Sequence, residues 1–89
     1  MKGLDDLNFN AQEIIKQTYI NKNSIVNSDY CGCYHCTKSF IPNKIEEYVD
    51  NGQTAICPYC GMDSVIGTNM GYNITTIFLK QLKKEIFEL

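Results

Sequence analysis

The sequence CYHC at residues 33–36 and the sequence CPYC at residues 57–60 dominate this 89-residue chain. They are two Cys-x-x-Cys units with twenty residues between them, a spacing typical of four-cysteine zinc sites. Two thiolates three positions apart on a tight turn can reach one ion, and two such turns complete a tetrahedron with Zn–S bonds of about 2.3 Å. The pattern therefore predicts one structural zinc ion. Its four predicted ligands are Cys33, Cys36, Cys57 and Cys60.

The residue that follows each unit also bears on this prediction. A zinc knuckle often needs a positive φ directly after its second cysteine, and glycine adopts that conformation without steric cost. Gly61 occupies this position in the second unit, whereas Thr37 occupies it in the first. The second unit therefore fits a knuckle better than the first.

The expected redox environment favours a metal over disulfides. The first seven residues include two aspartates and no apolar core, unlike a signal peptide, so we expect a cytoplasmic protein. No run of about 18 apolar residues is present, so we expect no transmembrane helix. Cytoplasmic thiols stay reduced, and an odd count of five cysteines fits a disulfide framework poorly.

Two further residues lie in or beside the first unit. We expect Cys31 to be a half-buried strand residue next to the knuckle, and the alternatives are ligation or support of a ligand. His35 lies between two predicted ligands, where side chains usually point away from the metal. We therefore expect His35 at the surface rather than as a ligand or a general base.

The chain is predicted to be a single domain, residues 1–89, built from three segments. Residues 1–28 have helical character from about residue 4 to residue 25, with a capping pair at Asn10 and Glu13 and closing turn residues at 21–24. Residues 29–67 form the zinc-binding core, and residues 74–89 form a C-terminal helix that Asn73 or Thr75 could cap. The apolar stripe of that last helix consists of Phe78, Leu79, Leu82, Ile86 and Leu89.

Within the core, residues 41–50 are predicted to form a short helix that starts near Pro42 and ends at Gly52. Residues 53–56 and residues 63–66 are predicted as the two strands of a hairpin around the second knuckle. The predicted fold class is a small α+β zinc-binding domain. Its two knuckles lie on short β-hairpins with a helix between them, and helices flank them at both ends.

The cysteine segment resembles a known class of proteins. The resemblance covers about residues 30–73 and is carried by CGCYHC at 31–36, Phe40, Pro42, GQTA at 52–55, CPYCG at 57–61 and DSVIG at 63–67. These residues resemble small bacterial cytoplasmic proteins of the zinc-ribbon-like, rubredoxin-like class with two zinc knuckles. The resemblance implies zinc binding at the four knuckle cysteines, and it implies no activity.

Enzymatic chemistry is not expected. Four thiolates close the coordination shell, whereas catalytic zinc keeps an open position. The chain has no P-loop, no Gly-x-Ser-x-Gly, no His-Glu-x-x-His and no deaminase motif. The redox alternative is a thiol-disulfide oxidoreductase that uses Cys57 and Cys60, because CPYC is similar to the active site of glutaredoxins. Gly61 and a strand-like stretch follow that motif, where such an active site would open a helix.

The expected function is a non-enzymatic protein-interaction, regulatory or inhibitor module of a bacterium or phage. Five tyrosines suit an interface, although packing around the zinc is the alternative for each of them. They are Tyr30, Tyr34, Tyr48, Tyr59 and Tyr72.

Nucleic-acid binding is the second hypothesis. Its support is a set of lysines that could instead form a solvated face: Lys38, Lys44, Lys80, Lys83 and Lys84. The net charge of −2 and the absence of arginine disfavour it.

Overall fold

The computed structural model describes residues 10–87, in which two short helices come first, five short strands follow, and a longer helix comes last. Two three-residue 3-10 turns, Pro42–Lys44 and Thr68–Met70, lie between them. In chain order the helices and strands are α1 (Ala11–Gln17), α2 (Lys22–Val26), β1 (Cys31–Cys33), β2 (Ser39–Phe40), β3 (Tyr48–Val49), β4 (Thr54–Ala55), β5 (Val65–Gly67) and α3 (Thr76–Phe87).

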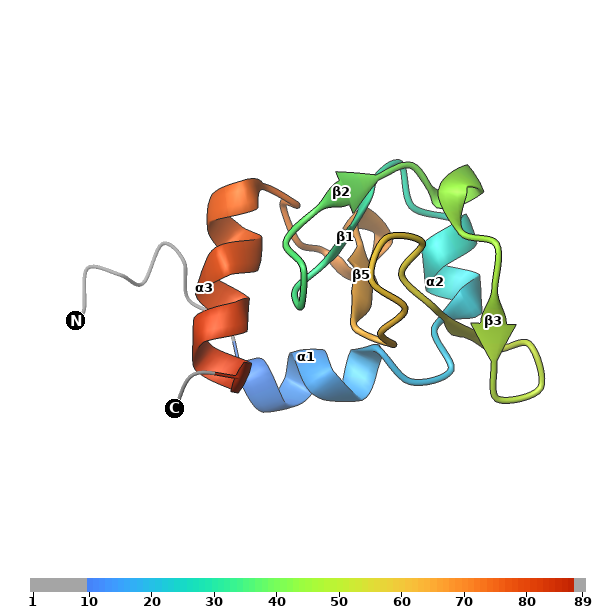
Figure 1. Ribbon diagram of the computed structural model, residues 1–89, viewed down its shortest axis with the longest axis horizontal. Coiled ribbons are helices and arrows are strands. Elements are labelled where there is room, and N and C mark those ends of the chain that lie inside the picture. The colour runs from blue at the N-terminus through green and yellow to red at the C-terminus, as the bar shows by residue number, and fades with distance from the viewer. Residues whose placement is uncertain (1–9, 88–89) are drawn as a thin grey trace.

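The strands form two small antiparallel sheets. β1 is the central strand of a three-stranded sheet with the order β2-β1-β5, and β3 pairs with β4 in a separate hairpin. In the first sheet Cys31 pairs with Phe40 on one side and with Gly67 on the other. Helix α3 lies at one end of the molecule, and α2 and β3 lie toward the other end (Figure 1). The predicted α+β class with antiparallel strands is therefore confirmed.

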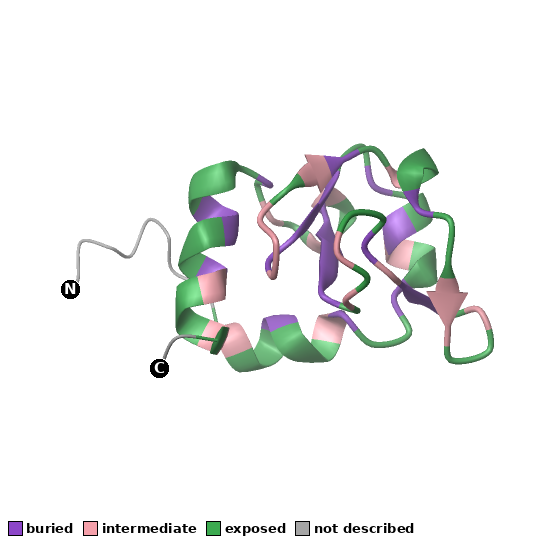
Figure 2. Ribbon diagram, viewed as in Figure 1, coloured by how far each residue is buried: buried purple, intermediate pink, exposed green. Residues whose placement is uncertain are grey.

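The central strand β1 and the edge strand β5 are both fully buried, as Figure 2 shows. Cys31, Cys33 and Val65 belong to the core cluster that also contains Ile25 of α2. Ile66 belongs instead to the cluster that contains the buried face of α3. Because successive strand residues face opposite sides of a sheet, the two clusters are separated by the sheet itself. Burial on both faces explains why β1 and β5 carry no polar residue.

Helix α1 has the predicted capping pair but is shorter than predicted. The side-chain oxygen of Asn10 accepts a hydrogen bond of 3.2 Å from the backbone N–H of Glu13, which confirms the capping pair. The helix ends at Gln17, and Ile20 has a φ of 52°, which no helix accommodates. Residues 22–24 then begin α2, so the predicted closing turn at 21–24 is wrong. The part of the predicted helix before Asn10 lies outside the described residues.

Asn21 explains this break in the helix. Its side chain is 4% exposed and bridges two strands, because Nδ2 donates to the Val65 carbonyl and Oδ1 accepts from the Ala55 N–H, both at 2.9 Å. If helix α1 continued through Ile20, the side chain of Asn21 would not reach both β4 and β5. A residue that the sequence suggests as a turn former therefore joins β4 to β5 on either side of the second knuckle.

The predicted helix over residues 41–50 is wrong. Only Pro42–Lys44 form a 3-10 turn, after which the chain extends and places Ile45 in the core. β3 follows within the predicted helix and pairs with β4. The turn between these two strands contains three consecutive positive φ angles, 56° at Asp50, 61° at Asn51 and 78° at Gly52. Asp-Asn-Gly is a typical hairpin turn, and it overrides the helical spacing that precedes it.

The hairpin predicted around the second knuckle is also wrong. The two flanking strands exist as β4 and β5, but β4 pairs with β3 while β5 pairs with β1. Only the first knuckle lies in a hairpin, between β1 and β2. The second knuckle is instead a link between the two sheets.

The C-terminal helix is confirmed as α3. The hydroxyl of Thr75 accepts a hydrogen bond of 3.0 Å from the backbone N–H of Phe78, so Thr75 is the cap rather than Asn73. Within the apolar stripe Phe78, Leu79 and Leu82 are buried and Ile86 is partly buried. Leu89 lies outside the described residues. Among residues 10–87, no helix has both the length and the apolar character needed to cross a membrane.

Candidate metal centre

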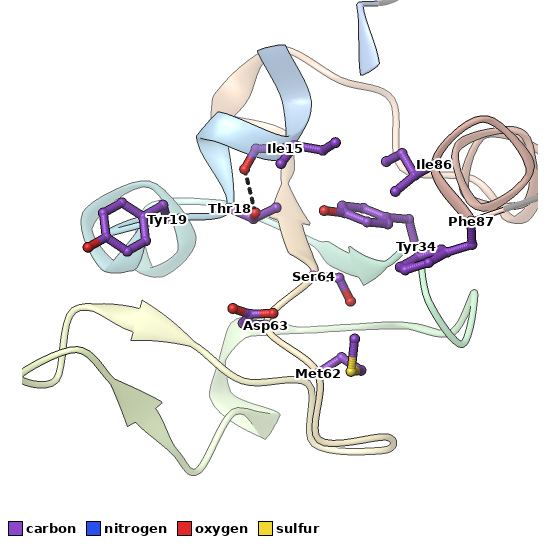
Figure 3. Close-up of a pocket in the computed structure, with 9 residues that line it drawn as sticks. All are labelled: Ile15, Thr18, Tyr19, Tyr34, Met62, Asp63, Ser64, Ile86 and Phe87. Atoms are coloured by element: carbon purple, nitrogen blue, oxygen red, sulfur yellow. Dashed lines mark hydrogen bonds between the residues drawn. The ribbon is translucent and has the colours of Figure 1, made fainter. Parts of the chain in front are cut away.

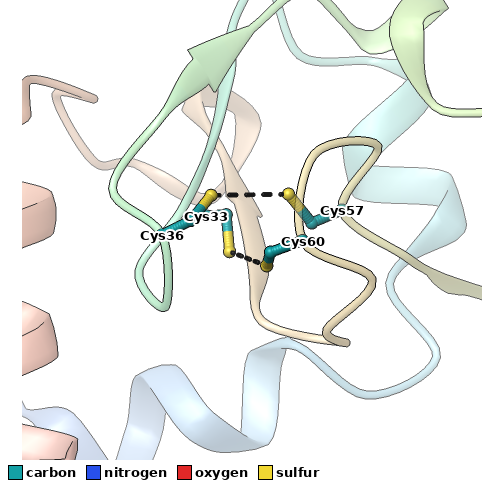
Figure 4. Close-up of side chains that lie close together, drawn as sticks. All are labelled: Cys33, Cys36, Cys57 and Cys60. Carbon is teal, nitrogen blue, oxygen red and sulfur yellow. Dashed lines mark hydrogen bonds between the residues drawn. The ribbon is translucent and has the colours of Figure 1, made fainter.

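The four predicted ligands meet at one point between the two knuckles. Their sulfur atoms all lie within 4.8 Å of one another, and no other residue of the described chain belongs to the group. The Cys33 and Cys60 sulfurs are 3.6 Å apart, and the Cys36 and Cys57 sulfurs are 3.7 Å apart (Figure 4). A tetrahedron with Zn–S bonds of about 2.3 Å has sulfur–sulfur edges of about 3.8 Å. The spacing therefore fits a tetrahedral metal ion at the centre.

The two knuckles share one backbone conformation, offset by 24 positions. In the first, Cys33 N–H bonds to the Lys38 carbonyl at 3.0 Å; in the second, Cys57 N–H bonds to the Met62 carbonyl at 2.9 Å. The backbone N–H directly after the second cysteine then closes each turn onto the carbonyl of the first cysteine, at 2.8 Å in the first knuckle and 3.0 Å in the second. The structural repeat is thus longer than the Cys-x-x-Cys unit visible in the sequence.

In each knuckle a backbone N–H also lies near the sulfur atom of the first cysteine. His35 N–H lies 3.3 Å from the Cys33 sulfur, and Tyr59 N–H lies 3.3 Å from the Cys57 sulfur. Hydrogen bonds of this kind stabilise thiolates, because they offset negative charge that water can no longer reach. The backbone of each knuckle is therefore already arranged for the charged form of its cysteines.

The position after each knuckle has the left-handed conformation that the sequence predicts for the second. Gly61 has a φ of 79°, and Thr37 has a φ of 64°. Threonine is β-branched and adopts this region only at a steric cost, so the first knuckle is strained where the second is not. Both knuckles therefore require the same backbone, although only one of them carries the residue best suited to it.

Exchanging these residue types tests that comparison. Gly61→Ala is expected to lower the free energy of unfolding by about 1 kcal/mol, because an L side chain enters the left-handed region. Thr37→Gly is expected to raise it by about 0.5 kcal/mol, because relief of strain exceeds the extra chain entropy of glycine. Urea unfolding at one fixed free zinc concentration measures both. A neutral Gly61→Ala, or a destabilising Thr37→Gly, would contradict this account.

Ser64 is a contact of the centre that the sequence does not mark. Its hydroxyl oxygen lies 3.1 Å from the Cys33 sulfur, and both side chains are buried. The Ser64 carbonyl also accepts a bond of 3.1 Å from the Tyr34 N–H, which fixes the residue beside the first knuckle. The hydroxyl can donate to a thiolate, so Ser64 is placed to orient Cys33.

The thiol pKa values follow burial and hydrogen bonding. Burial raises the pKa of Cys33 well above its usual range, and burial also raises the pKa of Cys60. Burial acts in the same direction on Cys36, but hydrogen bonds from the Lys38 backbone and from neighbouring thiols outweigh it and lower the pKa of Cys36. A metal must displace protons from the buried thiols, so metal binding releases protons to solvent.

Cys31 and His35 both lie outside the sulfur group. Cys31 is a strand residue, as expected, although it is fully rather than half buried, and burial raises its pKa to about 12. The expectation of a surface His35 is wrong in part, because its ring packs edge-on against Phe87 with centroids 5.2 Å apart. Its Nδ1 is buried and has no hydrogen-bond partner among residues 10–87.

The tyrosines and lysines considered for interactions differ in how far they are buried. Tyr34 is buried, Tyr48 and Tyr72 are partly buried, and Tyr30 and Tyr59 are exposed. Packing is therefore a sufficient explanation for Tyr34. Lys38 lies over the ring of Tyr59 at 5.8 Å from its centroid. Lys44 is exposed at the end of the first 3-10 turn. Lys80, Lys83 and Lys84 lie together on α3, where Lys80 and Lys84 are exposed and Lys83 is partly buried.

Comparison with models of known protein families, with curated proteins and with solved structures finds no match to this chain.

Proposed function

We propose that this chain is a small non-enzymatic protein in which Cys33, Cys36, Cys57 and Cys60 hold one structural zinc ion, and that it acts as a protein-interaction or regulatory module. The observation that carries the proposal is the convergence of four sulfurs within 4.8 Å. Thiolate ligands in a tetrahedral arrangement favour zinc over magnesium or calcium, which prefer oxygen ligands.

A structural role fits the small size of the two cores. The described strands are only two or three residues long, so hydrogen bonding within the sheets ties the two knuckles together weakly. A structural zinc contributes about 10 kcal/mol to folding in zinc-finger peptides, which is comparable to the total stability of a small domain. The metal would therefore join the first knuckle, between β1 and β2, to the second knuckle, between β4 and β5.

Cobalt substitution tests whether the site is closed. With Co²⁺ in place of zinc, we expect the intense visible bands of a tetrahedral four-thiolate centre. These bands should not change when azide or imidazole is added, because no coordination position is open. New bands on addition of either ligand would indicate an open site and would contradict the structural assignment.

The redox alternative predicts a different response. Reductases of this type use the two cysteines of one motif, whereas the sulfur pairs at 3.6 and 3.7 Å here join different motifs. We expect no reduction of insulin disulfides by the zinc-loaded protein in the presence of dithiothreitol beyond the dithiothreitol background. Acceleration that requires Cys57 would favour the oxidoreductase.

Protein is the proposed partner class rather than nucleic acid. The chain has eight lysines against ten acidic residues and a net charge of −2, so its overall field repels phosphate. Fluorescence anisotropy with random duplex and single-stranded DNA at low salt is expected to show no binding. Binding that weakens steeply with salt would favour the nucleic-acid alternative.

A further inference from the structure

A cavity of about 350 Å³ adjoins the metal centre, between α1, the end of α3 and the segment that follows the second knuckle. Its apolar lining comes from Ile15, Tyr19, Met62, Ile86 and Phe87 (Figure 3). The exposed fractions of three of these side chains are large for apolar residues, 39% for Ile15, 65% for Tyr19 and 43% for Phe87. The cavity therefore has an apolar wall that opens to solvent.

Some polar side chains of the cavity have hydrogen-bond partners within the protein, and one does not. The Thr18 hydroxyl donates to the Ile15 carbonyl at 2.6 Å, and the buried Tyr34 hydroxyl interacts with Thr18. Asp63 is exposed, and its carboxylate makes no ion pair or hydrogen bond with residues 10–87. The cavity thus presents one unpaired negative charge beside an apolar wall.

The neighbouring metal centre adds to this negative charge. Ser64 lines the cavity and also contacts the Cys33 sulfur at 3.1 Å, so one side chain separates the cavity from the ligands. Four thiolates around one zinc ion carry a formal charge of about −2. No lysine lines the cavity among the described residues. A ligand that matches it must be apolar along its length and positive at one end.

We propose that this cavity docks a basic side chain of a partner protein, with the aliphatic stem against Ile15 and Ile86 and the charged head at Asp63. This inference rests on the proposed role as an interaction module, and it names the chemistry of the partner. A free amine would leave Tyr19 and Phe87 exposed, whereas the residues beside a docked lysine or arginine would cover them. The partner is therefore a polypeptide with a basic residue between apolar ones.

Peptide titration of the ¹⁵N-labelled, zinc-loaded protein tests the proposal. The probes are acetyl-Leu-Lys-Leu-amide, its norleucine counterpart, which keeps the stem and lacks the charge, and n-hexylamine. We expect the lysine peptide to shift the amide signals of Thr18, Asp63 and Ser64 in a saturable way. Its binding should be about threefold tighter than that of the norleucine peptide, as a partly exposed ion pair allows. Hexylamine should bind more weakly than the lysine peptide.

Two variants separate the charge from the apolar wall. Asp63→Asn should remove the preference for lysine over norleucine, while Ile15→Ala should weaken both peptides. Asp29→Asn makes the same charge change at an exposed residue outside the cavity and should leave the preference intact. Equal binding of the two peptides, an unchanged preference in Asp63→Asn, or hexylamine binding as tight as that of the lysine peptide would overturn the proposal.

Metal content measured on the same samples keeps the two proposals distinguishable. If the protein carries one zinc per chain and shows no lysine preference, the docking proposal fails and the structural zinc stands. If it shows the Asp63-dependent preference without zinc, the docking proposal stands and the structural zinc fails.

Discussion

Replacing Cys57 by serine is expected to abolish metal binding and to unfold the protein at room temperature. The Cys57 side chain is 2% exposed and supplies one of the four converging sulfurs. Serine keeps the size of the side chain but is a poor zinc ligand, so most of the roughly 10 kcal/mol contributed by a structural zinc is lost. This loss is comparable to the stability of about 5–15 kcal/mol that a small domain has in total. Far-ultraviolet circular dichroism and zinc analysis of the purified variant measure the outcome.

Cys31→Ala is the matched control for this substitution. It also removes a buried thiol, two residues from a predicted ligand, but Cys31 lies outside the sulfur group. We expect this variant to keep one zinc per chain and to lose about 1 kcal/mol through the small cavity it leaves. A Cys57→Ser protein that keeps its zinc and its fold would contradict the account. A disulfide reductase would show another pattern, in which the same variant stays folded and loses only its activity.

Gly67→Ala is expected to have the next largest effect, although Gly67 is not a ligand. A Cβ atom at this position would lie 2.2 Å from the Ser28 hydroxyl oxygen and 2.9 Å from the Ser28 Cβ. That hydroxyl donates to the Ser24 carbonyl at 2.8 Å and accepts from the Asn69 N–H at 2.9 Å, so it cannot move without losing both bonds. We expect a loss of about 3 kcal/mol from overpacking, measured by urea unfolding.

Two comparisons identify this contact as the cause. Gly52→Ala places a Cβ in open space at a φ of 78°, so it should cost only about 1 kcal/mol from backbone strain. Adding Ser28→Gly to Gly67→Ala removes the atoms in conflict and should cost less than the sum of the two single changes. Strict additivity, or equal costs for Gly67→Ala and Gly52→Ala, would show that the close approach of Gly67 to Ser28 does not matter.

The sequence predicts each Cys-x-x-Cys knuckle well because the geometry of a knuckle is local. A Cys-x-x-Cys turn places two sulfurs together through its own backbone, and Gly61 marks the positive φ that completes the turn. The caps at Asn10 and Thr75 are predictable for the same reason, since each cap bonds to a backbone N–H three residues later.

The remaining structure depends on pairing between distant residues, which periodicity does not reveal. The sequence predicts both β4 and β5, but their partners are β3 and β1, and the hydrogen bonds of Asn21 hold β4 and β5 in place. The contact of Ser64 with Cys33 spans 31 positions and has no signature of its own. For residues 41–50 a local signal did exist, because Asp50, Asn51 and Gly52 are typical of a hairpin turn.

Removal of the metal is expected to unfold the protein, because the four cysteines hold the two knuckles together around one ion. Native mass spectrometry of protein purified without added metal, followed by circular dichroism during titration with a zinc chelator, tests this expectation. We expect one zinc per chain, and loss of the ion and of the fold together as the chelator removes it. A protein that carries no metal and stays folded, or one that keeps its fold after the zinc has been removed, would contradict the account.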